Sequence, residues 1–376
     1  MNPIEEYYEH MEEIQKVYGE RSIVLLMLGK FYEMYTDNNV DSIVARISKT
    51  LELNMTKRNG NLPFHRISNP YMCGAPVPAI GKYINKLLSA NFTIAIYDQF
   101  EPEELFPTSK KKERKLVKIL SPGCYMDDNT FDEKFNKGLL GIFPDTFVCP
   151  IQRTSKTNIY LTYVDVNTGR NNIGCLYEDT CHGNLLNELK KYIELLSPSE
   201  MVVFYETDKN LESINALMED YLHKSIHKIQ IKRDYNNITY ITKFLEKIFK
   251  EGDDAIHIFD YLNIRELPTE CLTNYIATLQ FIYEHDNIII QKIKLPLNID
   301  NVSSVYINND CIEQLNLISN KDNSLQYFNE KVYASLYDII NDKISTKMGN
   351  RVLRIRLTNP IKDVAILNKR YNNISH

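Results

Sequence analysis

Phe31 and Glu33 place an aromatic ring and a carboxylate close together where the chain is expected to turn. The apolar run Ile23–Leu28 stops at Gly29, and Lys30 follows before the ring. An apolar side chain at such a turn can be pushed between two base steps of a DNA duplex, at a cost of roughly a few kcal/mol for each unstacked step. The pattern therefore raises the hypothesis of a wedge that kinks DNA.

Glu33 makes this hypothesis more specific. Phosphates repel a carboxylate, so a general DNA-binding surface would avoid one, but a carboxylate is useful where it accepts a hydrogen bond from a displaced base. A correctly paired duplex resists kinking, whereas a mismatch has already lost part of that stiffness. The two side chains would then recognise how easily the DNA duplex deforms at a position and not its base sequence. The structural alternative is a core position for Phe31 and a helix N-terminal position for Glu33, where the helix dipole favours an acid.

Positive charge is concentrated in one part of an acidic chain. The net charge of the 376 residues is −5, but residues 57–118 hold eleven Lys or Arg against five acidic residues, a surplus of six positive charges. Such clustering is typical of a phosphate-binding face, although a solvated surface is the alternative. The residues predicted to meet DNA beside Phe31 and Glu33 are Lys30, Lys57, Arg58, Lys110, Lys111 and Lys112.

Motifs for nucleotide binding and hydrolysis are missing from the sequence. It contains 13 Gly and no GxxxxGK[ST], GxGxxG, HExxH or GxSxG pattern. One enzymatic alternative is a two-metal nuclease of the ribonuclease H type, with Asp165 as the first carboxylate and Glu188 and Glu206 as others. Against it, an Asp that opens a D-x-x-T-G turn commonly caps that turn. We therefore predict that this chain is not an enzyme.

The cysteines and the N-terminus indicate the general class of protein. Seven Cys are scattered without a CxxC pair, which argues against a disulfide framework, and Cys181-His182 lacks the second ligand pair of a zinc site. No apolar stretch approaches the roughly 18 residues of a membrane span. The first residues are acidic and amphipathic, unlike a signal peptide. We expect a soluble intracellular protein without bound metal, in a compartment that the sequence does not identify.

Hydrophobic periodicity predicts a small mixed α/β domain at residues 1–105. The elements expected in it are strands at 23–28 and 92–100 and helices at 38–53 and 80–88. Acids, prolines and a charge run then indicate a basic linker at 106–120.

A second α/β domain is predicted at residues 121–262. Its expected elements are a hairpin at 158–177 that turns at 167–169, helices at 185–196 and 242–249, and a strand at 200–206. From about Thr269 strand signals nearly vanish, and helical spacing such as that of residues 271–285 predicts a helical segment at 263–376. The predicted fold class is a multidomain α/β chain that ends in helices.

Several segments, in the same order along the chain, resemble MutS-type DNA mismatch repair proteins. GKFYEMY resembles the G-x-F-Y-E signature of their mismatch-recognition domain, and GAPVPA resembles a G-x-P-x-x-A segment that precedes a helix. YVDVNTGR resembles the hairpin of their connector domain. Residues 346–360 match a T-x-M-G-x-R-x-L-x-x-x-L-x-x-P run at the start of the lever domain.

The resemblance implies a mismatch-recognition domain, a connector with a ribonuclease H-like fold and the start of an α-helical lever domain. It implies that Phe31 is the intercalating wedge, that Glu33 contacts the unstacked base, and that Lys57 and Arg58 lie on a basic turn near the DNA backbone. The implied partner is double-stranded DNA with mismatches or small unpaired loops. The alternative within this resemblance is a MutS-like scaffold or regulatory part that does not read mismatches.

Three departures from the family pattern affect what we expect. Lys30 stands where the family usually has an acid, and Pro78 stands where some members direct a polar residue, often His, at the DNA. The family's ATPase, with ATP and Mg, and its dimer interface lie beyond residue 376. We therefore expect no cofactor in this chain, and a homodimer or heterodimer only through the missing C-terminal part.

Overall fold

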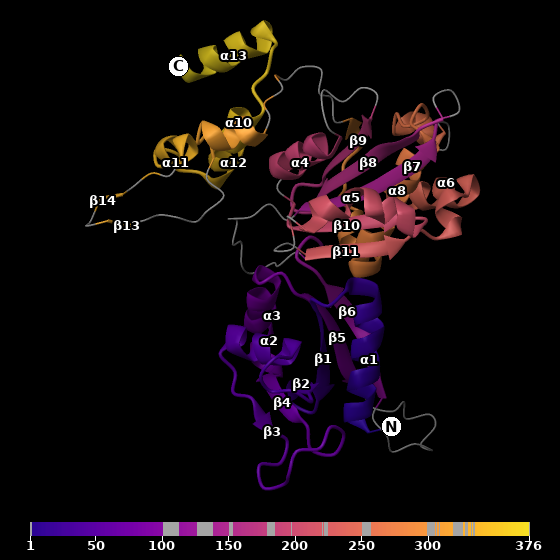
Figure 1. Cartoon of the computed structure of the whole chain (residues 1–376), viewed down its shortest axis with the longest axis vertical. Coiled ribbons are helices and arrows are strands. Elements are labelled where there is room, and N and C mark those ends of the chain that lie inside the picture. Colours follow the sequence, from indigo (N-terminus) through magenta and orange to yellow (C-terminus); the bar gives the residue numbers. More distant parts are fainter. Residues whose placement is uncertain are drawn as a thin grey trace.

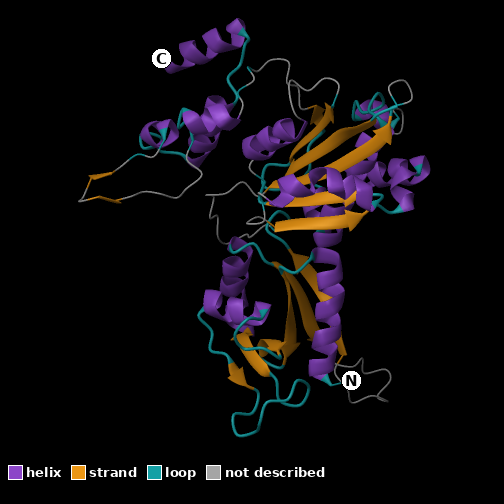
Figure 2. Cartoon of the chain, viewed as in Figure 1, coloured by secondary structure: helices purple, strands orange, loops and turns teal. Residues whose placement is uncertain are grey.

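The structure is a computed structural model of the chain. It describes residues 2–100, 113–125, 138–149, 153–178, 185–196, 198–219, 221, 225–249, 257–298, 305, 307, 309–318, 326–327, 330–331, 333 and 335–375. Two sheets, each with helices packed on it, are followed by a helical C-terminal part (Figure 2). The predicted multidomain α/β class is confirmed, while the domain boundaries stay a prediction.

The N-terminal sheet has the strand order β3-β4-β2-β1-β5-β6 (Figure 1). Its strands are β1 Ser22–Leu28, β2 Phe31–Thr36, β3 Thr56–Lys57, β4 Tyr71–Pro76, β5 Thr93–Phe100 and β6 Glu113–Leu120. β1 and β5 pair in parallel, and the other neighbours pair antiparallel. The strands predicted from the apolar runs are thus confirmed, and β1 is buried on both faces as a central strand between two helical layers should be.

Helices cover both faces of this sheet. They are α1 Pro3–Tyr18 on one face, and α2 Ile43–Leu51 and α3 Ile80–Ser89 on the other, with the short 3₁₀ helix η1 Val77–Ala79 before α3 (Figure 1). α2 is shorter than the predicted range 38–53 because Ser42 caps it and because the Asn38 side chain accepts hydrogen bonds from two following backbone N–H groups.

The predicted basic linker at 106–120 is wrong for its second half. Residues 113–120 form β6, which pairs antiparallel with β5 along its length. The charged residues that suggested a linker are those of an edge strand, where Lys and Arg side chains remain solvated and discourage pairing with another chain. Arg114 is an exception, because its side chain is only 9% exposed and binds Glu6 of α1 at 2.8 Å.

The second sheet has the order β11-β10-β7-β8-β9-β12. Its strands are β7 Gly138–Val148, β8 Ser155–Asp165, β9 Arg170–Tyr177, β10 Glu200–Tyr205, β11 Ser225–Gln230 and β12 Leu297–Asn298. The associated helices are α4 Leu185–Leu196, α5 Asp208–Glu219, η2 Arg233–Asn236, α6 Ile238–Phe249, α7 Ile258–Tyr261, α8 Thr269–His285 and α9 Asn287–Ile290. The predicted hairpin is confirmed as β8 and β9, and α4 has the predicted bounds.

α8 packs on the second sheet. The Asn274 amide donates to the backbone oxygens of Tyr160 at 3.1 Å and Gly141 at 3.3 Å. A Cβ at Gly141 would lie 2.0 Å from the Thr278 hydroxyl oxygen, so the helix approaches the strand closely. α8 is buried around most of its circumference, as a helix without a polar face must be. The predicted boundary at 262/263 therefore does not separate α8 from this sheet.

The C-terminal part is helical, as predicted. It contains α10 Asn309–Gln314, the short strands β13 Gln326–Tyr327 and β14 Glu330–Lys331, α11 Leu336–Asn341, α12 Lys347–Thr358 and α13 Val364–Ser375. Thr346 caps α12, with its hydroxyl accepting a hydrogen bond from the Gly349 N–H at 3.1 Å. The Thr and Gly of the 346–360 run thus have a local structural role.

Candidate nucleic-acid interface

Phe31 lies at the end of the tight hairpin between β1 and β2. Leu28 pairs with Phe31, which leaves a two-residue turn of Gly29 and Lys30. Gly29 has φ of 61°, the conformation that a type II′ turn requires at its first position and that Gly adopts without strain. The Lys30 carbonyl accepts from the Val77 N–H at 3.0 Å, which ties the turn to the start of η1. The turn is therefore fixed, and the Phe31 ring beside it is 48% exposed.

Glu33 and Tyr35 share one face of β2 with Phe31, because alternate residues of a strand point to the same side. The three side chains run from the exposed Phe31, through the half-buried Glu33, to the fully buried Tyr35. The Tyr35 hydroxyl donates a hydrogen bond to the Glu33 carboxylate. Neither residue fits the structural alternative: Phe31 is outside the core, and Glu33 lies in a strand and not at a helix N-terminus.

Lys57 and Arg58 lie at the other end of the β2–β4 ladder from Phe31. Lys57 pairs with Tyr71, which pairs with Thr36, whereas Phe31 pairs with Pro76. Lys57 ends β3 and Arg58 begins the loop between β3 and β4, and the Lys57 ammonium donates to the Leu62 carbonyl at 2.8 Å. The structure therefore brings Phe31, Glu33 and Lys30 together. It places the basic turn at the opposite end of β2, beyond the buried Tyr35.

The loop at residues 58–70 is organised around one buried side chain. The Asn69 amide donates to the carbonyls of Asn59, Leu62 and Pro63 at 2.9–3.1 Å, and its oxygen accepts from the Asn59 N–H at 2.7 Å. These bonds give the loop a defined shape without regular secondary structure. Sequence reasoning missed Asn69, although an Asn before Pro in a turn-rich segment was a signal that could have identified it.

The predicted basic face is only partly available for phosphates. Lys110, Lys111 and Lys112 lie outside the described residues. Among the described cations, Lys86 lies 3.9 Å from Glu52 and Lys118 lies 3.4 Å from Asp286, in partly exposed ion pairs. Such surface pairs are weak, so these two side chains can still turn to a phosphate. The exposed Lys30 stands beside the ring.

The nuclease alternative is not supported at Asp165. Its carboxylate accepts from the Asn167 N–H at 3.0 Å and from the Thr168 hydroxyl at 2.8 Å, which is the turn-capping role. The part of the chain that the structure describes contains no group of three or more His, Cys, Asp or Glu side chains arranged to hold a metal ion. Cys181 and His182 lie outside that part.

A buried ionic cluster joins the two sheets, and sequence reasoning did not find it. Glu200 on β10 accepts from the Ser121 hydroxyl at 2.6 Å and from His227 Nε2 on β11 at 2.5 Å. His227 Nδ1 lies 2.8 Å from the Tyr18 carbonyl at the end of α1. Burial acts to raise the pKa of Glu200, but the hydrogen bond and charge of His227 lower it overall. The ionised form of Glu200 is thus favoured, and the two ring nitrogens of His227 face two oxygens, those of Glu200 and of the Tyr18 carbonyl.

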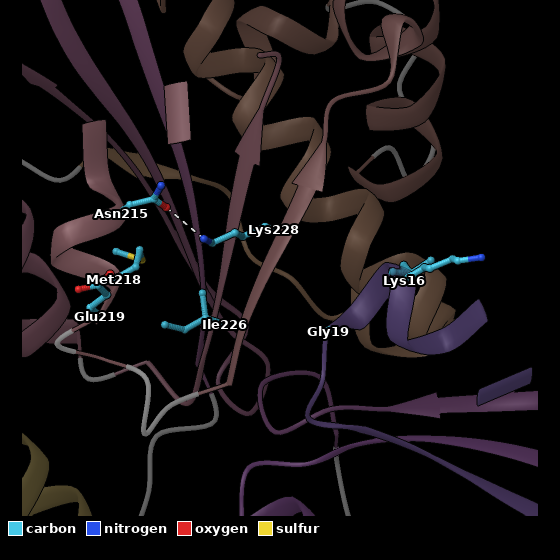
Figure 3. Close-up of a pocket in the computed structure, with 8 residues that line it drawn as sticks. Lys16, Gly19, Asn215, Met218, Glu219, Ile226 and Lys228 are labelled. Atoms are coloured by element: carbon cyan, nitrogen blue, oxygen red, sulfur yellow. Dashed lines mark hydrogen bonds between the residues drawn. The ribbon is translucent and has the colours of Figure 1, made fainter. Parts of the chain in front are cut away.

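A groove of about 510 Å³ lies where α1, α5 and β11 meet (Figure 3). It is lined from α1, α5 and β11, among others by Lys16, Gly19, Met218, Glu219, Ile226 and Lys228. The Lys228 ammonium donates to the Asn215 side-chain oxygen at 3.0 Å, as the dashed line shows. Opposite charges and apolar groups are mixed in this lining, so it has no evident catalytic chemistry.

Among the helices of the described part, none is both long and apolar enough to cross a membrane.

Comparisons with known proteins agree with the sequence motifs. Residues 2–129 match MutS domain I. The chain is 27% identical to a mutS homolog of Acanthamoeba polyphaga mimivirus, over 94% of the chain and 33% of that protein. It is 28% identical to the DNA mismatch repair protein MutS of Clostridioides difficile, over 96% of the chain and 33% of that protein. For MutS of Borrelia hermsii the identity is 29%, over 94% and 35%. The chain thus spans about a third of the length of these relatives.

Proposed function

We propose that this chain, which is of the MutS type, recognises mismatches and small unpaired loops in double-stranded DNA. The names of its relatives supply the process, DNA mismatch repair. The observation that carries the proposal is the position of Phe31, an exposed aromatic ring on a rigid two-residue turn with a carboxylate next to it on the same strand face.

In this proposal Phe31 inserts between base steps at a defect. A ring that is held by a short hairpin loses little conformational freedom when it inserts, so most of the stacking energy is available for binding. Stacking of an aromatic side chain on a base contributes about 1–3 kcal/mol. A matched duplex must be unstacked at a higher cost than a mismatch, and this difference produces the preference.

Glu33 then contacts the unstacked base, and basic residues contact the phosphates. Lys30 is the cation nearest to the wedge in sequence, and Lys57, Arg58 and the run Lys110, Lys111 and Lys112 are proposed as further backbone contacts. Phosphate contacts give affinity without selectivity and make binding weaken as salt rises. We also propose that the first sheet, β6 included, belongs to the recognition domain, that the second sheet with α8 belongs to the connector, and that the C-terminal helical part is the start of the lever.

ATP hydrolysis and dimer formation are proposed only for a protein of the relatives' full length. No step of the recognition proposed for this chain needs a nucleotide or a metal ion, because intercalation, hydrogen bonding and phosphate contacts suffice.

The test compares binding of the chain to one duplex sequence, either matched or with a single unpaired T, at low salt. We expect tighter binding to the defective duplex, and we expect Phe31→Ala to lower this preference between about fivefold and 150-fold, the equivalent of about 1–3 kcal/mol. Phe147→Ala is the control, because Phe147 is 38% exposed on β7 of the other sheet. Equal binding to both duplexes, unaffected by Phe31→Ala, would reject mismatch reading and favour the scaffold alternative.

A further inference from the structure

Tyr35 is the one described residue found to donate a hydrogen bond to the Glu33 side chain. Its ring is 1% exposed and packs edge-to-face against Tyr7 of α1, with ring centroids 5.3 Å apart. Burial, followed by the Glu33 hydrogen bond, raises the pKa of Tyr35 well above its ordinary value. The phenol therefore keeps its proton at every physiological pH and is a permanent donor.

The Tyr35 hydroxyl restricts where the Glu33 carboxyl group lies. The hydroxyl points its hydrogen at Glu33 Oε2, and an oxygen with lone pairs satisfies it. The second oxygen, Oε1, has no hydrogen-bond partner among the residues that the structure describes. One oxygen of the carboxylate is thus held by the protein, and the other is left to accept a hydrogen bond from outside.

The strand next to β2 also restricts the Glu33 side chain. Glu33 pairs with Gly74 of β4, and a Cβ at Gly74 would lie 3.0 Å from the Tyr32 carbonyl oxygen and 3.4 Å from Glu33 Cγ. The Glu33 side chain therefore lies over a position where any larger residue would crowd it. With Tyr35 at its end and Gly74 beneath it, the carboxylate is fixed on the same strand face as Phe31.

We propose that Tyr35 is a positioning residue that holds the Glu33 carboxyl group in place, so that its second oxygen can accept a hydrogen bond from an N–H group of an unstacked base. This inference rests on the proposed mismatch recognition and adds the residue that positions the base contact. Thymine and guanine offer a ring N–H, and adenine, cytosine and guanine offer an amino group. In a matched pair the Watson–Crick partner occupies the ring N–H and one N–H of each paired amino group, whereas an unpaired base has all of them free.

The first test removes only the hydroxyl. Tyr35→Phe keeps the ring against Tyr7, and we expect it to lower the preference for a duplex with an unpaired T over the matched duplex by about tenfold, the size expected for one hydrogen bond to a charged group. Tyr7→Phe is the matched control, since it removes a buried hydroxyl from the adjoining ring without touching the Glu33 hydrogen bond. In a Glu33→Ala background, Tyr35→Phe should have no further effect, because Tyr35 acts through Glu33.

The second test changes the base. An unpaired N3-methylthymine has the shape of thymine with a methyl group in place of the ring N–H. The chain should bind it several-fold more weakly than unpaired thymine, and Glu33→Ala should remove most of this difference, which separates the lost hydrogen bond from the bulk of the methyl group.

The outcomes distinguish the role of Tyr35 from the proposed mismatch recognition. If the chain prefers the unpaired T but Tyr35→Phe or the N3-methyl group changes nothing, Tyr35 only fills the core and the inference is overturned while mismatch recognition stands. If Tyr35→Phe still lowers the preference in the Glu33→Ala background, Tyr35 does not act through Glu33. A chain with no preference for the unpaired T overturns both.

Discussion

Replacing Glu200 by Ala tests how the two sheets are held together. Glu200 is completely buried and His227 nearly so, and the two side chains are 2.5 Å apart. The variant leaves the buried His227 without its Glu200 partner and also removes the acceptor for the Ser121 hydroxyl and the Gly123 N–H. Removal of one partner from a buried ion pair costs about 3–5 kcal/mol, so we expect the free energy of unfolding to fall by that amount.

Guanidinium chloride unfolding provides the measurement. The chain has no Trp and 25 Tyr, so tyrosine fluorescence is followed beside far-UV circular dichroism, and the two signals together show whether both sheets unfold in one transition. His227→Ala should cost a similar amount, and the double variant should cost clearly less than the sum because the two single variants break the same pair.

The surface pair of Glu12 and Lys16 is the control. Its atoms are 2.9 Å apart, a distance as short as that of many strong pairs, but both side chains are 71% exposed. Glu12→Ala should therefore leave the unfolding midpoint almost unchanged. If Glu200→Ala costs less than about 1 kcal/mol, or if the two buried variants add fully, the cluster is not a coupled ion pair and the reasoning from burial fails.

Two further predictions concern pH and the β3–β4 loop. Burial lowers the pKa of His285 in the folded chain below its ordinary value of 6.5. As pH falls, the unfolded chain therefore binds a proton at this residue before the folded chain does, and this favours unfolding. The contribution of neutral His285 to stability is complete above about pH 6.5 and is lost as pH falls toward the lower folded pKa. His285→Phe should flatten the fall in midpoint between about pH 6.5 and 5.5, and an unchanged slope would contradict this assignment. Asn69→Ala removes four hydrogen bonds within residues 58–70. Limited proteolysis should therefore cut this loop faster in the variant than in the wild type or in Asn61→Ala, a control at an exposed position of the same loop. Equal rates of cleavage would show that the shape of the loop does not depend on Asn69.

Much of the local structure could be predicted because it depends on residues close in sequence. The apolar run Ile23–Leu28, the period of α4 and the turn at Asn167–Gly169 each carry their own signal, and the structure has a strand, a helix and a hairpin there. The errors also have local causes. The charged residues of β6 led to the prediction of a linker, and the turn at Asn38 makes α2 begin later than predicted.

The candidate site was predictable only in part. The spacing of Phe31 and Glu33 suggested that they act together, and β2 places them on one face. The sequence did not show that Tyr35 is the buried end of the same row, because this depends on Tyr7 of α1 packing against it. Lys57 lies far along the ladder from Phe31 for a similar reason: the register of β4 on β2 determines where the basic turn falls.

By itself, the sequence determined the class of the chain, most of its elements and the residues with unusual chemistry, because periodicity, turn residues and short motifs act over a few positions. Only the tertiary structure decided which distant groups meet. Glu200, His227 and Tyr18 come from three separate segments, and their charge and hydrogen bonding exist only once α1, β10 and β11 have packed together. Likewise α8 is a helix by its own pattern but belongs to the second sheet through Asn274 and Thr278, since a pattern of apolar residues fixes which face is buried and not what covers it.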